Sequence, residues 1–273
     1  DMEFLPGMEV RLGEEYTVQW PSVLYIDGYN FGGEQYMIPA LQQLGIPYDK
    51  FDYLDLAGNW RAPLKRDFGG TIHNPGGYGN NGCTTEQLLG YRLIILSNGT
   101  GNAEDFEMFE VWLETTSCGL AGIRRGIIFD GDGIAGQIES LAIEFCHNVL
   151  GTTLVAGSYR DYNMDPADCV YLEPADSPEF AIAAPGDALY GNGCPQEYDY
   201  NVVGLQAGVT GVTGNLDFWS YEQTGNQEFV EFAQVVRIRQ QTGVANWRSA
   251  VNGFSFHHSA ERGCAGEPCG NDS

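Results

Sequence analysis

Acidic and amide side chains follow several apolar runs in the first half of the chain. They are Asp27, Asn98, Asp130 and Asp132. Because the carboxyl ends of parallel strands meet at one edge of a sheet, where ligands of α/β proteins bind, these side chains are expected to share such an edge. There they could hold a divalent cation or act as a nucleophile and base pair. The favoured alternative is that they cap the helices that follow by accepting hydrogen bonds from free backbone N–H groups.

A second group of oxygen-bearing side chains alternates along one stretch, as ligands do in calcium-binding loops. Its members are Asp161, Asn163, Asp165 and Asp168. Pro166 occupies the position where an EF-hand loop has glycine, and the terminal glutamate of such a loop is absent. The stretch therefore predicts either a calcium site or a cluster of turns held in place by Cys169.

Other patterns bear on zinc, nucleotide and sugar binding. His257 and His258 are neighbours, and on a strand their side chains point to opposite faces, so they do not predict a shared zinc ion. The run Gly28-Tyr-Asn-Phe-Gly-Gly33 lacks the Gly-x-Gly-x-x-Gly spacing, so no nucleotide cofactor is expected. Aromatic residues in or near loops could stack on sugars or pack against a partner, although such residues more often cover a core. They are Tyr29, Phe31, Tyr36, Trp60, Tyr78, Trp219 and Tyr221.

The charge balance limits the partners of the chain. Among 273 residues, 37 are Asp or Glu and 13 are Lys or Arg, which gives a net charge of -24 at pH 7. Such a surface repels nucleic-acid phosphates and anionic lipids, so neither nucleic-acid binding nor membrane insertion is expected. The same charge suits cations, a salty medium or a basic partner, and in the simplest case it only keeps the chain soluble.

The seven cysteines indicate the compartment. Five of them lie in loops rich in Gly, Pro, Asn or Asp, which is typical of disulfides in secreted and cell-surface proteins. No Cys-x-x-Cys pair is present, so a zinc site built on cysteines is not expected. Cys146 falls on an apolar helical segment and is predicted to be unpaired. The chain begins with Asp1 and shows no hydrophobic leader, so it is expected to be processed or cut from a longer precursor.

Alternating apolar segments predict the elements that position these residues. Strands are expected at 22–26, 48–54, 93–96 and 126–129, and helices at 34–44, 103–115 and 138–150. In the last of these helices, the apolar residues, Leu141 and Ile143 among them, are expected to be largely buried. This alternation favours a parallel sheet with helices on both faces, in which the apolar runs at 22, 93 and 126 lie side by side. Further along, strands are expected at 202–205, 216–219 and 232–238, and residues 237–249 fit either a strand or a helix.

The same order of elements predicts a single α/β domain over residues 21–262. Its parts are a core at 22–150, a β-rich insertion or extension at 151–249 and a return to the core at 250–262. An arm or linker at 1–20 precedes the domain, and a cysteine-containing tail at 263–273 follows it.

The segment Gly253-Phe-Ser-Phe-His257-His-Ser-Ala-Glu261 resembles the Gly-x-x-Phe-His-Pro-Glu segment of class I glutamine amidotransferases. In that family the His and Glu complete a Cys-His-Glu triad at the carboxyl edge of a flavodoxin-like sheet. His257 matches this His, whereas Glu261 stands two residues further along. The nucleophile turn of the family corresponds to Asp130-Gly-Asp132-Gly, where Asp132 replaces the Cys. The chain is also similar to divergent flavodoxin-like domains of large secreted bacterial proteins.

The absent nucleophile, the loop cysteines and the acidic surface together favour a non-catalytic extracellular domain with a structural or protein-interaction role. Its expected partners are other protein domains, or copies of itself, in a surface assembly. One alternative is a secreted hydrolase in which Asp130 and Asp132 act with His257 and Glu261. This alternative requires Asp130 or Asp132 within hydrogen-bond reach of His257. A further alternative is a carbohydrate-binding module built on the aromatic loops.

Overall fold

The computed structural model describes residues 22–28, 34–52, 85–98, 106–116, 123–131, 133–158, 170–174, 189–191, 201–222, 225–240, 246–255 and 259–261. The elements are β1 (Val23–Gly28), α1 (Glu34–Gln43), β2 (Tyr48–Asp52), α2 (Thr85–Leu88), β3 (Leu93–Asn98), α3 (Glu107–Glu114), β4 (Arg124–Asp130), α4 (Ile134–Leu141), the π-helix η2 (Phe145–Leu150), β5 (Thr152–Ala156), β6 (Val170–Pro174), β7 (Leu189–Gly191), β8 (Val202–Leu205), β9 (Val212–Glu222), β10 (Gly225–Arg239), β11 (Asn246–Asn252) and β12 (Ser259–Glu261). None of these helices is long and apolar enough to cross a membrane.

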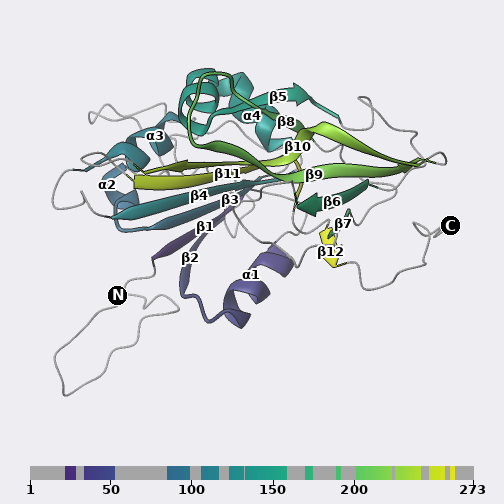
Figure 1. Cartoon of the computed structure of the whole chain (residues 1–273). Helices are drawn as coiled ribbons and strands as arrows, with labels where there is room; N and C mark the ends of the chain where they lie inside the picture. Colours follow the sequence, from purple (N-terminus) through teal and green to yellow (C-terminus); the bar gives the residue numbers. More distant parts are fainter. Residues whose placement is uncertain are drawn as a thin grey trace, which may run out of the picture.

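Five parallel strands form one part of a mixed sheet (Figure 1). Their order across the sheet is β2-β1-β3-β4-β11, and each neighbouring pair is parallel. The pairs Val23↔Leu93 and Leu93↔Gly126 confirm that the three predicted apolar runs lie side by side. Beyond β11 the sheet continues through antiparallel strands in the order β10-β9-β6-β7-β12, while β8 pairs with both β10 and β5. The chain therefore has an α/β fold.

One face of the parallel strands packs against α2, α3, α4 and η2, and we call it the helical face (Figure 1). Side chains alternate between the two faces of a strand, so every second residue points to this side. Ile127 and Phe129 of β4 are buried there next to Phe109 and Phe145 from the helices. The ring of Phe129 meets those of Phe109 and Phe145 edge to face, at centroid distances of 5.6 and 6.1 Å. Burial of each such side chain contributes about 1.5–3 kcal/mol.

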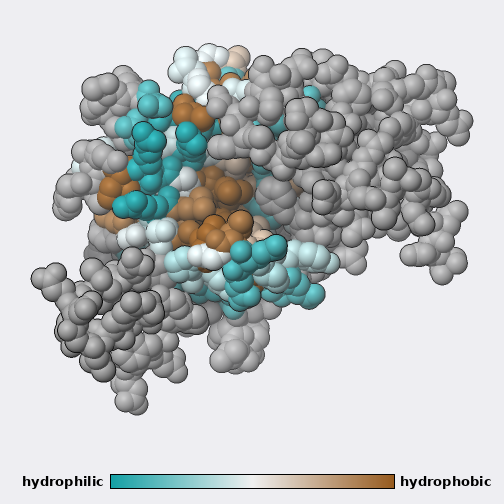
Figure 2. Space-filling view, turned by 60° about the horizontal axis from the view of Figure 1, so that its bottom comes forward, coloured by the Kyte–Doolittle hydropathy of each residue, from teal (hydrophilic) through white to brown (hydrophobic). Residues whose placement is uncertain are grey.

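The opposite face of these strands carries α1, and we call it the α1 face. Val23, Tyr25 and Ile95 are buried on this face against Leu41 of α1. Seen from this side, apolar side chains of the described residues lie next to hydrophilic ones (Figure 2). The chain leaves α1 through Gly45, whose φ of 64° is a left-handed conformation that favours glycine. Described helices thus lie on both faces of the parallel strands, as the sequence predicts.

The helix predicted at 138–150 differs in the structure. α4 begins earlier because the fully buried side chain of Ile134 extends its apolar stripe. The helix then breaks at Ala142, which has a non-helical φ of -146°, and the chain resumes helical turns that lead into the π-helix η2. As a result, Leu141 and Ile143 are 49% and 51% exposed, although the sequence predicts them to be largely buried. A single helical period carried through this break places Leu141 and Ile143 on the buried side of the helix, whereas both are exposed.

Strands predominate after residue 151, as the sequence predicts. The structure adds β5, and it divides the ambiguous segment 237–249 between the end of β10 and the start of β11. β11 already belongs to the parallel strands, so the chain rejoins them at Asn246 rather than at residue 250. Residues 259–261 form β12, which pairs with β7 and so joins the antiparallel part of the sheet.

Cys146 is a buried free cysteine, which confirms the prediction for this residue. Its Sγ lies 3.3 Å from the carbonyl oxygen of Thr152, to which the thiol donates a hydrogen bond. Burial, reinforced by the charge of Glu139, raises the pKa of this thiol to about 12. Cys146 therefore packs as a small apolar side chain and is not a reactive thiolate. The six other cysteines, on which the predicted disulfides depend, lie outside the described residues.

Candidate functional site

Polar side chains continue from strand to strand at the carboxyl edge of the parallel strands, where the sequence places a site. They occupy positions in register, or next to register, on neighbouring strands from β2 to β9. Since side chains in register point to the same side of a sheet, the members on β2, β1, β3, β4, β11 and β10 share the α1 face. The member on β9 lies beside a register shift and joins them through its hydrogen bond to β10. We call this set the polar row. Its members are Asp52, Asp27, Ser97, Asp130, Asn252, Gln234 and Asn215.

Hydrogen bonds join the most deeply buried members of the polar row into one chain that ends on Asp130. Asn215 Nδ2 donates to Gln234 Oε1 at 2.5 Å, and Gln234 Nε2 donates to Asn252 Oδ1 at 2.6 Å. Asn252 Nδ2 then donates to Asp130 Oδ1 at 3.1 Å. From the other side, the Ser97 hydroxyl donates to Asp130 Oδ2, also at 3.1 Å. Donors from both sides thus converge on one carboxylate.

These hydrogen bonds connect side chains on neighbouring strands and so stabilise the sheet. All five side chains are at most 3% exposed, so water does not replace a partner that is lost. A hydrogen bond to a charged group contributes about 1.5–3 kcal/mol, and a buried polar group left without a partner costs about 1–3 kcal/mol. Aligned bonds also polarise and strengthen one another. The carboxylate of Asp130 is therefore fixed in place by β3 and β11.

Asp27 has different surroundings at the other end of the polar row. Lys50 Nζ lies 2.8 Å from Asp27 Oδ2 and 2.8 Å from Asp52 Oδ1. Burial raises the pKa of Asp27 to about 6, although the hydrogen bond and charge of Lys50 act in the opposite direction. Burial lowers the pKa of Lys50, but its two aspartate partners outweigh this and raise it overall. Asp27 therefore changes charge close to neutral pH while Lys50 stays positive.

Tyr25 precedes Asp27 by two residues and points to the same face of β1. It is 0% exposed. Burial raises the pKa of this phenol well above its usual range, and the charges of Asp27 and Asp130 reinforce the effect. The hydroxyl of Tyr25 consequently stays protonated near neutral pH and does not serve as a base.

The turn after β4 is held against the segment that follows β11. The backbone N–H of Gly131 donates to the carbonyl oxygen of Phe254 at 3.1 Å, and that of Asn201 donates to Gly253 at 2.7 Å. Gly131 and Gly133 have φ values of 146° and 86°, which side-chain-bearing residues rarely adopt. β4, this turn and α4 form the strand–turn–helix arrangement that the sequence predicts here.

The structure brings two of the predicted site residues to one edge. Asp27 and Asp130 both lie at the carboxyl ends of parallel strands, with Ser97 in register between them. The helix-cap interpretation is wrong for Asp130 with respect to α4, because the N-cap of this helix is Gly133, without a side-chain hydrogen bond. Asp130 instead accepts hydrogen bonds from side chains of the two neighbouring strands.

The other candidates lie outside the described residues, so the predictions about them stay predictions. Those residues are Asp132, His257, the side chains of Asn98 and Glu261, and the proposed calcium ligands Asp161, Asn163, Asp165 and Asp168. The backbone of Glu261 belongs to β12, which is separated from β4 in the sheet order by five strands. Within the described ranges, no group of three or more His, Cys, Asp or Glu side chains could hold a metal ion.

Sequence reasoning missed Lys50 and the uncharged members of the polar row. Ser97 and Asn252 had a readable signal, because each is a polar residue near the carboxyl end of an apolar strand. Gln234 and Asn215 had none, because an irregular register between β9 and β10 decides that these two amides meet.

No protein-family model, curated protein or solved structure matches this chain.

Proposed function

We propose that this chain is a non-catalytic extracellular domain with a structural or protein-interaction role in a larger surface protein or assembly. The observation that carries the proposal is the setting of Asp130, the member of the candidate catalytic set whose side chain the structure describes. Its carboxylate is 1% exposed and accepts hydrogen bonds from Ser97 and Asn252. A nucleophile or general base must offer a lone pair to its substrate. Asp130 uses its oxygens to join three strands instead.

A flavodoxin-like core is part of this proposal. With β11 counted as the fifth strand, the parallel order β2-β1-β3-β4-β11 corresponds to the 2-1-3-4-5 order of flavodoxin-like sheets. In such sheets a ligand binds where β1 and β3 diverge. Here the ends of those strands carry Asp27, which is paired with Lys50, and the buried Ser97. These contacts support a core that serves as a scaffold.

The structural role of Asp130 can be measured. In Asp130→Ala, Ser97 and Asn252 lose their shared acceptor, so the free energy of unfolding in urea should fall by about 3 kcal/mol. Glu144→Ala removes an exposed carboxylate as a matched control and should cost less than about 0.5 kcal/mol. Similar small losses in both variants would contradict the scaffold role.

The non-catalytic role requires a separate test of activity and association. We expect no turnover of ester, amide or glycoside substrates by the wild-type protein above that of Asp130→Asn. We also expect the mass in analytical ultracentrifugation to rise with concentration towards about 1 mM, since copies of the chain are proposed partners. Turnover that Asp130→Asn abolishes would overturn the non-catalytic role. A constant monomer mass would leave only other protein domains as partners.

One backbone hydrogen bond bears on the hydrolase alternative and suggests how to test it. The backbone N–H of Gly131 donates to the carbonyl oxygen of Phe254, so the described residues Gly131 and Phe254, which come shortly before Asp132 and His257 in the chain, lie side by side. If this alternative holds, His257→Ala should abolish turnover and leave the melting temperature unchanged. For the carbohydrate-binding alternative, Tyr36 is the aromatic candidate whose side chain is described, and it is 58% exposed on α1.

A further inference from the structure

β5 is an edge strand, because among the described strands it pairs with β8 alone. Such a strand offers backbone N–H and C=O groups with which another chain can pair. The sequence of β5, Thr152-Thr-Leu-Val-Ala156, contains three β-branched residues and neither a charged residue nor a proline. Charged residues and prolines are common means of keeping an edge strand from pairing further. Any protection of this edge therefore comes from neighbouring elements.

The register between β5 and β8 determines which backbone groups of β5 point outward. The N–H of Gln206 donates to the carbonyl oxygen of Gly151 at 2.8 Å, so these two residues form a hydrogen-bonded pair. Hydrogen-bonded and non-hydrogen-bonded pairs alternate along antiparallel strands. Thr152 and Leu154 lie one and three positions further along, so each belongs to a non-hydrogen-bonded pair. Their backbone groups consequently point away from β8.

Side chains from α4 and η2 occupy these outward positions, and α4 packs beside β5 (Figure 1). The backbone N–H of Leu154 donates to Oε2 of Glu139 at 2.5 Å. The thiol of Cys146 donates to the carbonyl oxygen of Thr152, with Sγ at 3.3 Å. Burial, reinforced by the charge of Glu139, raises the pKa of this thiol to about 12, so the thiol remains a donor at neutral pH.

The carboxylate of Glu139 is in contact with three elements of the fold. Besides its bond to β5, its Oε1 lies 3.2 Å from Nε2 of His147 on η2, and its side chain is only 22% exposed. A hydrogen bond from a backbone N–H to a carboxylate is about twice as strong as one between neutral groups. Glu139 thus takes the place of the carbonyl oxygen that a neighbouring strand would offer to Leu154.

We propose that Glu139 and Cys146 form an edge cap, which prevents β5 from pairing antiparallel with β5 of a second copy of this chain. With Thr152 of one copy opposite Leu154 of the other, the carbonyl oxygen of Thr152 would accept the N–H of Leu154, and these are the two groups that the edge cap occupies. The contact would be the same on both copies, as in a two-fold symmetric dimer.

The composition of β5 favours a second copy as the occupant of this edge. The strand carries no charge although the net charge of the chain is -24, so two β5 strands can pair without like charges directly opposite one another. Its β-branched residues also favour the extended conformation that pairing requires. The inference goes beyond the proposed function, because the edge cap acts whether or not the wild-type chain assembles through other surfaces.

Analytical ultracentrifugation of Glu139→Ala tests the edge cap. This variant leaves the N–H of Leu154 without its acceptor, so it should sediment with twice the monomer mass at about 50 µM, a concentration at which the wild type should be a monomer. Glu144→Ala is the matched control, because it removes an exposed carboxylate between α4 and η2 and should keep the monomer mass. Glu139→Gln retains an oxygen that accepts the N–H of Leu154, so it should stay a monomer as well.

A further variant establishes that the copies meet at β5. Val155 is 38% exposed, and a lysine beside a strand edge opposes pairing. Glu139→Ala/Val155→Lys should therefore return to the monomer mass. A dimer that persists in this double variant would place the contact elsewhere and overturn the proposal.

A monomer mass for folded Glu139→Ala would overturn the proposal too. If this variant shows no cooperative melting, hydrogen exchange in the wild type decides instead. The amide of Leu154 should then exchange at least about 100-fold more slowly than that of an unstructured peptide, and exchange at the peptide rate would overturn the edge cap. Failure of the proposed self-association has a different sign, which is a wild type that remains a monomer up to about 1 mM.

Discussion

Two aspartates that follow the same sequence pattern have different surroundings in this protein. Asp27 and Asp130 each come after an apolar run, and both end parallel strands of one sheet. Asp130 receives donors from two neighbouring strands, whereas Asp27 is buried beside the cation of Lys50. At the scale of the residue, burial and partners decide what a carboxylate does, and position after a strand does not.

The pH dependence of stability should report the setting of Asp27. Its pKa is about 6 in the folded protein against 3.8 for the unperturbed group, so between these values the folded state binds more protons than the unfolded state. The contribution of Asp27 is therefore fully present below about pH 4 and is lost as the pH rises through 6. Relative to Asp27→Asn, the wild type should lose up to about 3 kcal/mol of unfolding free energy from about pH 4 to pH 7, measured by urea denaturation.

Glu144→Gln provides the control for this measurement, because Glu144 is exposed. Its unfolding free energy at pH 7 should lie within about 0.5 kcal/mol of that of the wild type, as is usual for a surface substitution. A difference between the wild type and Asp27→Asn that stays constant with pH would show that burial does not raise the pKa of Asp27.

At the scale of elements, the spacing of apolar residues predicted strands and helices correctly where the whole segment has the same pattern of burial. The strands at 22–26, 93–96 and 126–129 are confirmed because continuous apolar runs are buried or half-buried on both faces. The helix predicted at 138–150 was misplaced because the break at Ala142 changes the period within the segment. The four residues of α2 are too few to show any period.

The close contact between Gly253, which follows β11, and Asn201 gives a prediction at the scale of elements. A Cβ atom at Gly253 would lie 1.8 Å from the carbonyl oxygen of Asn201, which is backbone and cannot move aside without displacing β8. Gly253→Ala should therefore lower the unfolding free energy in urea by about 3 kcal/mol. Gly157→Ala is the matched control, because nothing lies within 4 Å of its added Cβ. Equal effects in the two variants would contradict the close approach of these segments.

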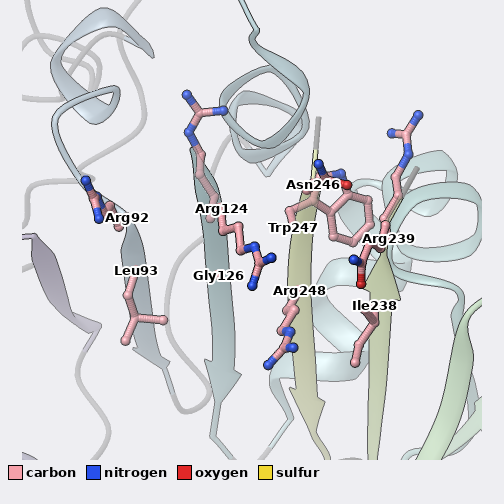
Figure 3. A pocket seen from close by; sticks show the side chains of 11 residues that line it. Arg92, Leu93, Arg124, Gly126, Ile238, Arg239, Asn246, Trp247 and Arg248 are labelled. Atoms are coloured by element: carbon pink, nitrogen blue, oxygen red, sulfur yellow. The ribbon is translucent and has the colours of Figure 1, made fainter. Parts of the chain in front are cut away.

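At the scale of the whole molecule, charge is distributed unevenly. The net charge of -24 makes the folded chain repel itself, while five of its 13 Lys and Arg residues line one pocket at the amino ends of β3, β4 and β11 (Figure 3). Salt screens the first effect over distances beyond about 10 Å. The stability of this chain should therefore depend on ionic strength more than that of a chain with balanced charge.

Thermal melting tests this expectation. Raising NaCl from about 20 mM to about 500 mM should increase the melting temperature by at least about 3 °C, because screening reduces self-repulsion. Calcium and magnesium chloride at equal ionic strength form the control. An extra increase with calcium, reversed by a chelator, would support the proposed site at Asp161–Asp168. A melting temperature that falls with NaCl would contradict the role of self-repulsion.

The sequence by itself determined the α/β class, the three adjacent parallel strands, the unpaired Cys146 and the edge that carries Asp27 and Asp130. These features follow from local rules, since apolar runs, turn residues and the common direction of parallel strands act over a few residues at a time. Only the tertiary structure decided that Ser97 and Asn252 converge on Asp130 and that arginines from β4 and β11 share one pocket. Such contacts depend on register between strands distant in the chain, and no local pattern encodes that register.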